Sequence, residues 1–169
     1  MSLQELLNPG REQHPKVWGN EDWLVNNEQY NFCGKNLVLL PQHHCSLHYH
    51  NVKIELFYVN KGIVFMEFDG QKGIMTPGTT LLIRQRQRHR FTGITPAEII
   101  EFSTYHRDED SIREEPSGKW TDDEFKKLTF PYKEDITHAL ETYKQNLRQS
   151  YQTTNFEIDK LLQEKHTSL

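Results

Sequence analysis

Short apolar runs separated by polar turns occupy the chain from residue 17 to about residue 105. In chain order, the runs are CGKNLVLL (33–40), CSLHYH (45–50), IELFYVN (54–60), IVFMEF (63–68), TTLLIRQ (79–85) and AEIIEFSTY (97–105). The DGQKG segment at 69–73 is typical of a tight hairpin turn. At least six short strands at this spacing, with no long helix between them, predict an antiparallel sandwich or barrel.

The pattern changes after residue 118, where apolar residues recur at helical spacing. Thr121 and Glu124 form the signature of an N-terminal capping box, and residues 135–151 indicate an amphipathic helix. A shorter helical stretch is predicted near 156–164. The predicted organisation is a polar N-terminal arm at 1–16, a β-domain at 17–118 and a helical extension at 119–169.

Composition and charge narrow the class of protein. At 169 residues the chain can bury one hydrophobic core. Its net charge of -4 argues against nucleic acid or an acidic membrane surface as a partner, and no apolar run approaches the ~20 residues that span a bilayer. The N-terminus lacks a secretory signal pattern, and Cys33 and Cys45 fit buried free thiols. We therefore expect a cytoplasmic protein.

The strongest chemical signal is a group of histidines followed by a glutamate. His48 and His50 alternate on one predicted strand, so their side chains face the same side, roughly 7 Å apart along the strand. Glu55 follows after a polar break, and His89 lies on a later strand or its leading turn. Three imidazoles and one carboxylate leave coordination positions open, as catalytic metal sites do. We predict one divalent ion here, chosen from Zn, Mn, Fe, Ni and Co.

Two neighbouring histidines do not fit this site. His44 shares the parity of His48 but lies ~13 Å back along a regular strand, and His43 has the opposite parity. Both are predicted to be ordinary pocket or surface residues. For His48, His50 and His89, a purely structural role is the simpler alternative. The type, number and strand placement of these candidate ligands nevertheless agree with metal binding.

The same residues resemble the two motifs of the cupin family. The first motif corresponds to HYHNVKIELFYVNKG at 48–62, and the second to PGTTLLIRQRQRHRF at 77–91. All four ligand positions are filled. The sequence departs from the two motifs at two points, and both concern the shape of loops. Gln42 stands where the first motif usually begins with glycine, and RQRQR replaces the usual Pro-Pro-Gly of the second motif. The resemblance implies an all-β cupin fold, which is a double-stranded β-helix or jelly-roll barrel.

Within the cupins, residues 17–118 are similar to the cupin module of type II mannose-6-phosphate isomerases, and D-lyxose isomerases have a similar layout. The Trp-Gly opening at Trp18 and the segment IIEFSTYHRDEDSIREEPSG (99–118) carry this likeness. It implies an enzyme acting on a small sugar or sugar phosphate, as an aldose–ketose isomerase or an epimerase. The family resemblance also implies a homodimer.

Such an isomerase needs a base that moves a proton between adjacent carbons. Glu101 is the first candidate because apolar residues flank it, and a carboxylate there either faces a cavity or is costly to bury. Lys53, between His50 and Glu55, could polarise a substrate oxygen. The alternatives are an ion pair with an arginine for Glu101 and a solvated position for Lys53.

Arginines in the second motif offer a further way to bind substrate. Four of them alternate on the predicted strand: Arg84, Arg86, Arg88 and Arg90. If their shared face is exposed to solvent, they form only a polar edge. If the loop turns some of them inward, their guanidinium groups suit a phosphate or a sugar nucleotide. On this second interpretation, Arg84 and Arg86 bind substrate.

Two other functions remain open for this ligand set. With iron, three histidines and one glutamate can activate oxygen, as in a dioxygenase. A non-catalytic cupin could instead bind a carbohydrate or another small ligand without turnover. Oxygen uptake with Fe(II) would identify the first function, and ligand-dependent stabilisation without product would identify the second.

Overall fold

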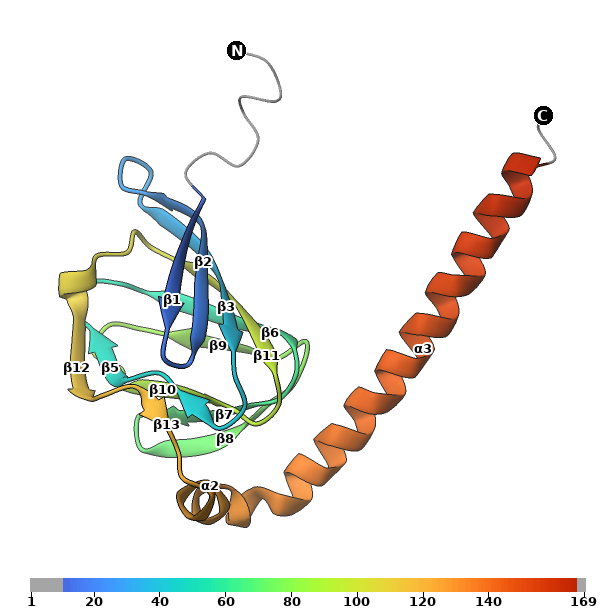
Figure 1. Cartoon of the computed structure of the whole chain (residues 1–169). Helices are drawn as coiled ribbons and strands as arrows, with labels where there is room; N and C mark the ends of the chain where they lie inside the picture. Colours follow the sequence, from blue (N-terminus) through green and yellow to red (C-terminus); the bar gives the residue numbers. More distant parts are fainter. Residues whose placement is uncertain (1–10, 167–169) are drawn as a thin grey trace. The chain divides into compact units, whose positions relative to one another are not determined.

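A computed structural model of the chain describes the backbone of residues 11–166 and the side chains of residues 11–154 (Figure 1). The chain divides at Lys133 into two compact units, the first rich in strands and the second helical. Within the described part of the chain, no helix has an apolar stretch long enough to cross a membrane.

Six antiparallel strands form the first sheet of the β-unit. In spatial order they are β1 (Glu12–Lys16), β2 (Gly19–Asn27), β3 (Phe32–Leu39), β11 (Ala97–Ser103), β6 (Glu55–Lys61) and β9 (Thr80–Ile83). Strand β11 is central, because it pairs with β3 along one edge and with β6 along the other. Segments far apart in sequence therefore supply neighbouring positions in this sheet.

The second sheet is organised around β10 (His89–Gly93). On one side, β10 pairs with β7 (Val64–Phe68), which continues to β8 (Gln71–Met75). On the other side it pairs with the short strands β4 (His43–His44) and β5 (Leu47–His50). These pair in turn with β13 (Gly118–Lys119) and β12 (Ser111–Glu115). The β10–β5 pairing places His89 directly opposite His48.

All six apolar runs identified in the sequence contain a strand, and the predicted hairpin turn is present between β7 and β8. Its central residues, Asp69 and Gly70, have φ of 46° and 79°, as the two-residue turns that match strand twist require. The polar N-terminal arm predicted at 1–16 is a strand in its described part, because residues 12–16 form β1. This polar strand, with Pro15, lies at the edge of the sheet, where proline is tolerated. Residues 1–10 lie outside the described part of the chain.

The inward faces of β3 and β11 change from apolar to polar along the strand. Leu37 and Leu39 of β3 contribute to a buried core between the two sheets, whereas Lys35 of the same face lies beyond it. In β11, Ile99 belongs to the core and Glu101 follows on the same face. Because β11 pairs with β3 in register, these polar positions lie together at one end of the sandwich. The polar cavity of the β-unit lies at this end.

Helices follow the last strand in sequence. Thr121 and Glu124 form the predicted capping box at the start of α2 (Asp122–Thr129). After a short 3-10 turn at Phe130–Tyr132, α3 (Lys133–His166) is one continuous helix of 34 residues. The sequence pattern predicted two separate helical pieces here. The stretch between them, 152–155, contains no glycine or proline that would end a helix.

Gly62, between β6 and β7, has a φ of 75° and a tightly packed backbone. A Cβ atom here would lie 2.2 Å from the carbonyl oxygen of Pro96 and 2.8 Å from the Cβ of Ala97. We expect Gly62→Ala to lower the free energy of unfolding by about 2–5 kcal/mol, combining left-handed strain with overpacking. Urea unfolding measures this loss.

Gly78→Ala is the matched control for this substitution. Its φ is 89°, but an added Cβ would meet nothing within 4 Å. Only the conformational cost of about 1–2 kcal/mol is therefore expected. Equal losses in the two variants would show that the close approach at Gly62 does not contribute.

Candidate metal centre

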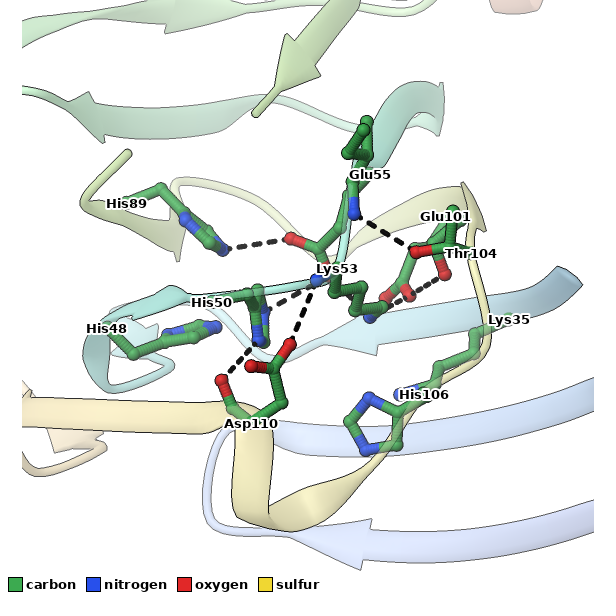
Figure 2. A network of polar contacts seen from close by, with 12 residues as sticks. Lys35, His48, His50, Lys53, Glu55, His89, Glu101, Thr104, His106 and Asp110 are labelled. Atoms are coloured by element: carbon green, nitrogen blue, oxygen red, sulfur yellow. Dashed lines mark hydrogen bonds and ion pairs between the residues drawn. The ribbon is translucent and has the colours of Figure 1, made fainter. Parts of the chain in front are cut away.

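Three imidazole rings face one another at the polar end of the sandwich (Figure 2). His48 and His50 come from β5, and His89 comes from β10. Their ligand atoms all lie within 4.8 Å of one another. The predicted alternation of His48 and His50 on one strand is present, and the β5–β10 pairing supplies the third ring.

Each ring is oriented by a backbone carbonyl. The Nδ1 of His48 lies 2.8 Å from the Ser46 oxygen, that of His50 lies 3.1 Å from the Asp110 oxygen, and that of His89 lies 3.0 Å from the Gln87 oxygen. A carbonyl only accepts, so in the neutral ring each Nδ1 donates and Nε2 keeps its lone pair. Burial and the nearby His89 lower the pKa of His48 to about 3. Neutral imidazole with a free Nε2 is the form that binds metal.

Glu55 completes the cluster from the start of β6. Its Oε2 lies 3.1 Å from His89 Nε2, and its Oε1 lies 3.4 Å from His50 Nε2. Despite these distances, the Nε2 atoms of both histidines and Oε2 of Glu55 are buried without a hydrogen-bond partner. Lone pairs that face one another in a buried site need a cation between them. The residues therefore fit a divalent ion, with nitrogen and oxygen ligands.

Lys53 joins the candidate ligand Glu55 to the predicted base Glu101. The Nζ of Lys53 lies 2.5 Å from Glu55 Oε1 and 2.5 Å from Glu101 Oε1. Burial alone would lower the pKa of Lys53, but the two carboxylates outweigh it and raise this pKa. For Glu55, burial opposes ionisation, while the charge of Lys53 holds its pKa well below the usual range. Both Lys53 and Glu101 are buried in the cavity, and neither alternative of the sequence analysis holds.

Asp110 fixes the loop that carries Lys53. Its carboxylate accepts hydrogen bonds from the backbone N–H groups of Asn51, Val52 and Lys53, at 2.9–3.2 Å. Its backbone oxygen also orients His50. Asp110 was not predicted as a site residue, because its role depends on contacts with residues almost sixty positions earlier in the chain.

The cluster opens into a cavity of about 100 Å³. Trp18, Phe57 and Phe91 form its apolar wall, with the rings of Trp18 and Phe91 packed edge to face at 4.9 Å. The cationic side chains of the lining are Lys16, Lys35, Lys53 and Arg113. The anionic ones are Glu21, Glu55, Glu101 and Asp108. Cations and anions are thus equal in number before any metal ion is added.

Arg84 and Arg86 do not reach this cavity. Both side chains are exposed in a turn between β9 and β10, where Arg86 has a φ of 62°. The turn interrupts the strand, so the alternation assumed for the arginines does not continue through it. Arg90 is buried but pairs with Glu67 and Glu115 at 2.5 Å. The interpretation of Arg84 and Arg86 as substrate-binding residues is therefore corrected.

Two buried residues of the cavity were missed in the sequence. Lys35 alternates with Cys33 and Leu37 on the inward face of β3, so strand parity could have identified it. His106 follows the end of β11, where no periodic signal exists. His43 and His44 lie outside the histidine cluster, as predicted, and neither lines the cavity. Cys33 and Cys45 are buried free thiols, as predicted.

Known proteins show similarity to the β-unit. Residues 36–103 match the family model described as a cupin domain. Similar solved structures include KdgF from Halomonas sp., with 15% identity over 58% of this chain and 89% of that chain and a TM-score of 0.53. An RmlC-like cupin from Shewanella frigidimarina has 16% identity over 59% and 88%, with a TM-score of 0.53. Oxalate decarboxylase from Bacillus subtilis has 14% identity over 62% and 30%, with a TM-score of 0.53. No curated protein sequence matches this chain.

These similarities establish the fold of the β-unit, and this fold brings the candidate metal ligands together. The matched range contains both strands that carry the histidine cluster and the start of β6, which carries Glu55. Two facing antiparallel sheets with a C-terminal helical extension agree with the all-β jelly-roll predicted from the sequence. The β-unit therefore has the cupin fold, and residues 36–103 match the cupin family model.

Proposed function

We propose that this protein is a metal-dependent enzyme that interconverts an aldose and a ketose through proton transfer between adjacent carbons. The proposal rests on the pairing of Lys53 with Glu101 beside Glu55 of the candidate metal centre. The resemblance of residues 17–118 to cupin sugar isomerases supports the same class of reaction. A small polar cavity with an apolar wall suits a compact hydroxylated compound.

The chain itself supplies the groups that such a reaction needs. A divalent ion at the cluster would supply electrostatic stabilisation for a substrate carbonyl and hydroxyl. Glu101 would take the proton from the hydroxyl-bearing carbon and return it to the neighbouring carbon. Ser103 Oγ donates to Glu101 Oε1 at 2.9 Å and helps to hold that carboxylate. Lys53, kept charged by its two carboxylates, would stabilise negative charge on the substrate oxygens.

Replacing the proposed base gives a direct test of this function. The Mn²⁺-loaded protein is incubated with aldopentoses, aldohexoses and their phosphates in deuterated water, and ketose formation is followed by NMR. We expect Glu101→Gln to lower turnover about 10²–10⁴-fold, because the amide cannot accept the transferred proton. Its metal content should equal that of the wild type.

Glu98→Gln is the matched control. Glu98 lies on the same strand but pairs with Asn60 and Lys61 outside the cavity. Turnover should be unchanged in this variant. Wild-type protein that stabilises on adding a sugar but forms no ketose would instead indicate a ligand-binding cupin, and undiminished turnover of Glu101→Gln would remove Glu101 from the mechanism.

A further inference from the structure

A second group of polar side chains lies in the cavity apart from the histidine cluster. Figure 2 shows Lys35 and His106 next to each other, with Lys53 and Glu101 between them and the three imidazoles. Lys35 comes from β3 and is 2% exposed, and His106 follows β11 and is 8% exposed. Both line the cavity. The proposed reaction at the cluster leaves these two side chains without a role.

His106 is held in place and keeps one unsatisfied acceptor. Its backbone N–H donates to Asn26 Oδ1 at 2.9 Å, and its ring packs against Trp23 at 4.9 Å. Nε2 lies 3.2 Å from Asp108 Oδ1, whereas Nδ1 is buried without a partner. Burial and the charges of Lys35 and Lys53 lower the pKa of His106 to about 4. In the neutral ring, Nε2–H donates to Asp108, so Nδ1 is an acceptor.

Lys35 supplies donors on the same side of the cavity. Its Nζ lies 3.2 Å from Glu21 Oε2 and 4.4 Å from the ring centroid of Trp23. An ammonium has three N–H donors, and the Glu21 carboxylate accepts one of them. Burial opposes ionisation of Glu21, but Lys35 and its other partners lower the pKa of Glu21 to about 2. Lys35 and Glu21 therefore form a charged pair that retains hydrogen-bonding capacity.

We propose that Lys35 and His106 recognise one hydroxyl group of the substrate, remote from the atoms bound at the metal. Lys35 donates a hydrogen bond to the hydroxyl oxygen, and the hydroxyl donates its hydrogen to His106 Nδ1. This inference rests on the proposed function and deepens it, because it requires a polyhydroxylated chain that reaches from the metal to this second point. Lys35 and His106 are then specificity-determining residues.

The charges around this point favour a hydroxyl over other groups. The ammonium groups of Lys35 and Lys53 disfavour a second metal ion at His106, since both raise the local positive potential. An anionic group would have to compete with Glu21, which already pairs with Lys35. A hydroxyl both accepts and donates, and it satisfies the two partners without adding charge.

Linear polyols test the proposal without requiring turnover. Ethylene glycol, glycerol, erythritol and ribitol are titrated into the Mn²⁺-loaded protein, and NMR line broadening of the polyol gives Kd and the carbon nearest to the metal. In the wild type we expect Kd to fall about tenfold at the length where a hydroxyl reaches His106. His106→Leu and Lys35→Met should each abolish this step while retaining the metal.

Two further variants separate recognition from a structural effect. His106→Asn keeps an acceptor oxygen near the position of Nδ1 and should retain most of the step, while His43→Leu, outside the cavity, should retain all of it. The same step in His106→Leu, or no step in the wild type, would overturn the inference and leave Nδ1 to bind water. Because polyols are not isomerised, failure of the proposed isomerase activity is a separate result.

Discussion

Lys53→Met is expected to lower the free energy of unfolding of the metal-free protein by about 3–5 kcal/mol, as measured by urea denaturation. Lys53 is the cation that both Glu55 and Glu101 contact at 2.5 Å, and all three side chains are buried. Without it, two carboxylates either remain charged and uncompensated or take up protons, and both outcomes cost stability.

Metal addition and a second substitution test this explanation. Mn²⁺ should stabilise Lys53→Met more than it stabilises the wild type, because the ion restores positive charge beside Glu55. Adding Glu101→Gln to Lys53→Met should recover part of the lost stability, since one of the two unpaired charges is removed.

The matched control is Lys61→Met. Lys61 pairs with Glu98 at 2.9 Å, but its side chain is 61% exposed, so the loss should stay below about 1 kcal/mol. A loss of the same size in both lysine variants would mean that the buried network contributes no more than a surface ion pair.

The parts of the site that were predictable are those carried by regular strands. Strand alternation placed His48 and His50 together, and the same rule applied to β3 would have placed Lys35 inward. Gln42, which stands where the cupin motif usually has glycine, has a φ of 64°, in the left-handed region that favours glycine.

The parts that could not be predicted depend on turns and distant contacts. Arg84 and Arg86 were predicted to bind substrate if the loop turned them inward, but a turn at this point ends the strand and both side chains are exposed. The bridge between Lys53 and Glu101 depends on the loop that Asp110 holds, and Asp110 is remote in sequence. Such pairings follow from strand order, which periodicity along a single segment does not encode.

The second large expected effect concerns metal binding at the histidine cluster. Purified protein, or protein supplied with Mn²⁺, Zn²⁺ or Fe²⁺, is expected to hold about one divalent ion per chain, measured by inductively coupled plasma mass spectrometry. His50→Ala should reduce this to a small fraction, because it removes one of the three imidazoles whose ligand atoms lie within 4.8 Å of one another. His43→Ala, outside the cavity, should keep the full metal content.

Metal binding should also appear as stability, independently of the metal count. An ion that binds only the folded protein adds about 2.7 kcal/mol at a free concentration one hundred times its Kd, and His50→Ala should lose this gain while remaining folded by circular dichroism. If the wild type shows neither metal uptake nor stabilisation, the buried Nε2 atoms of His50 and His89 must be satisfied by a ligand or water instead. The proposed isomerisation would then lack its electrostatic centre, and a metal-free ligand-binding function would be favoured instead.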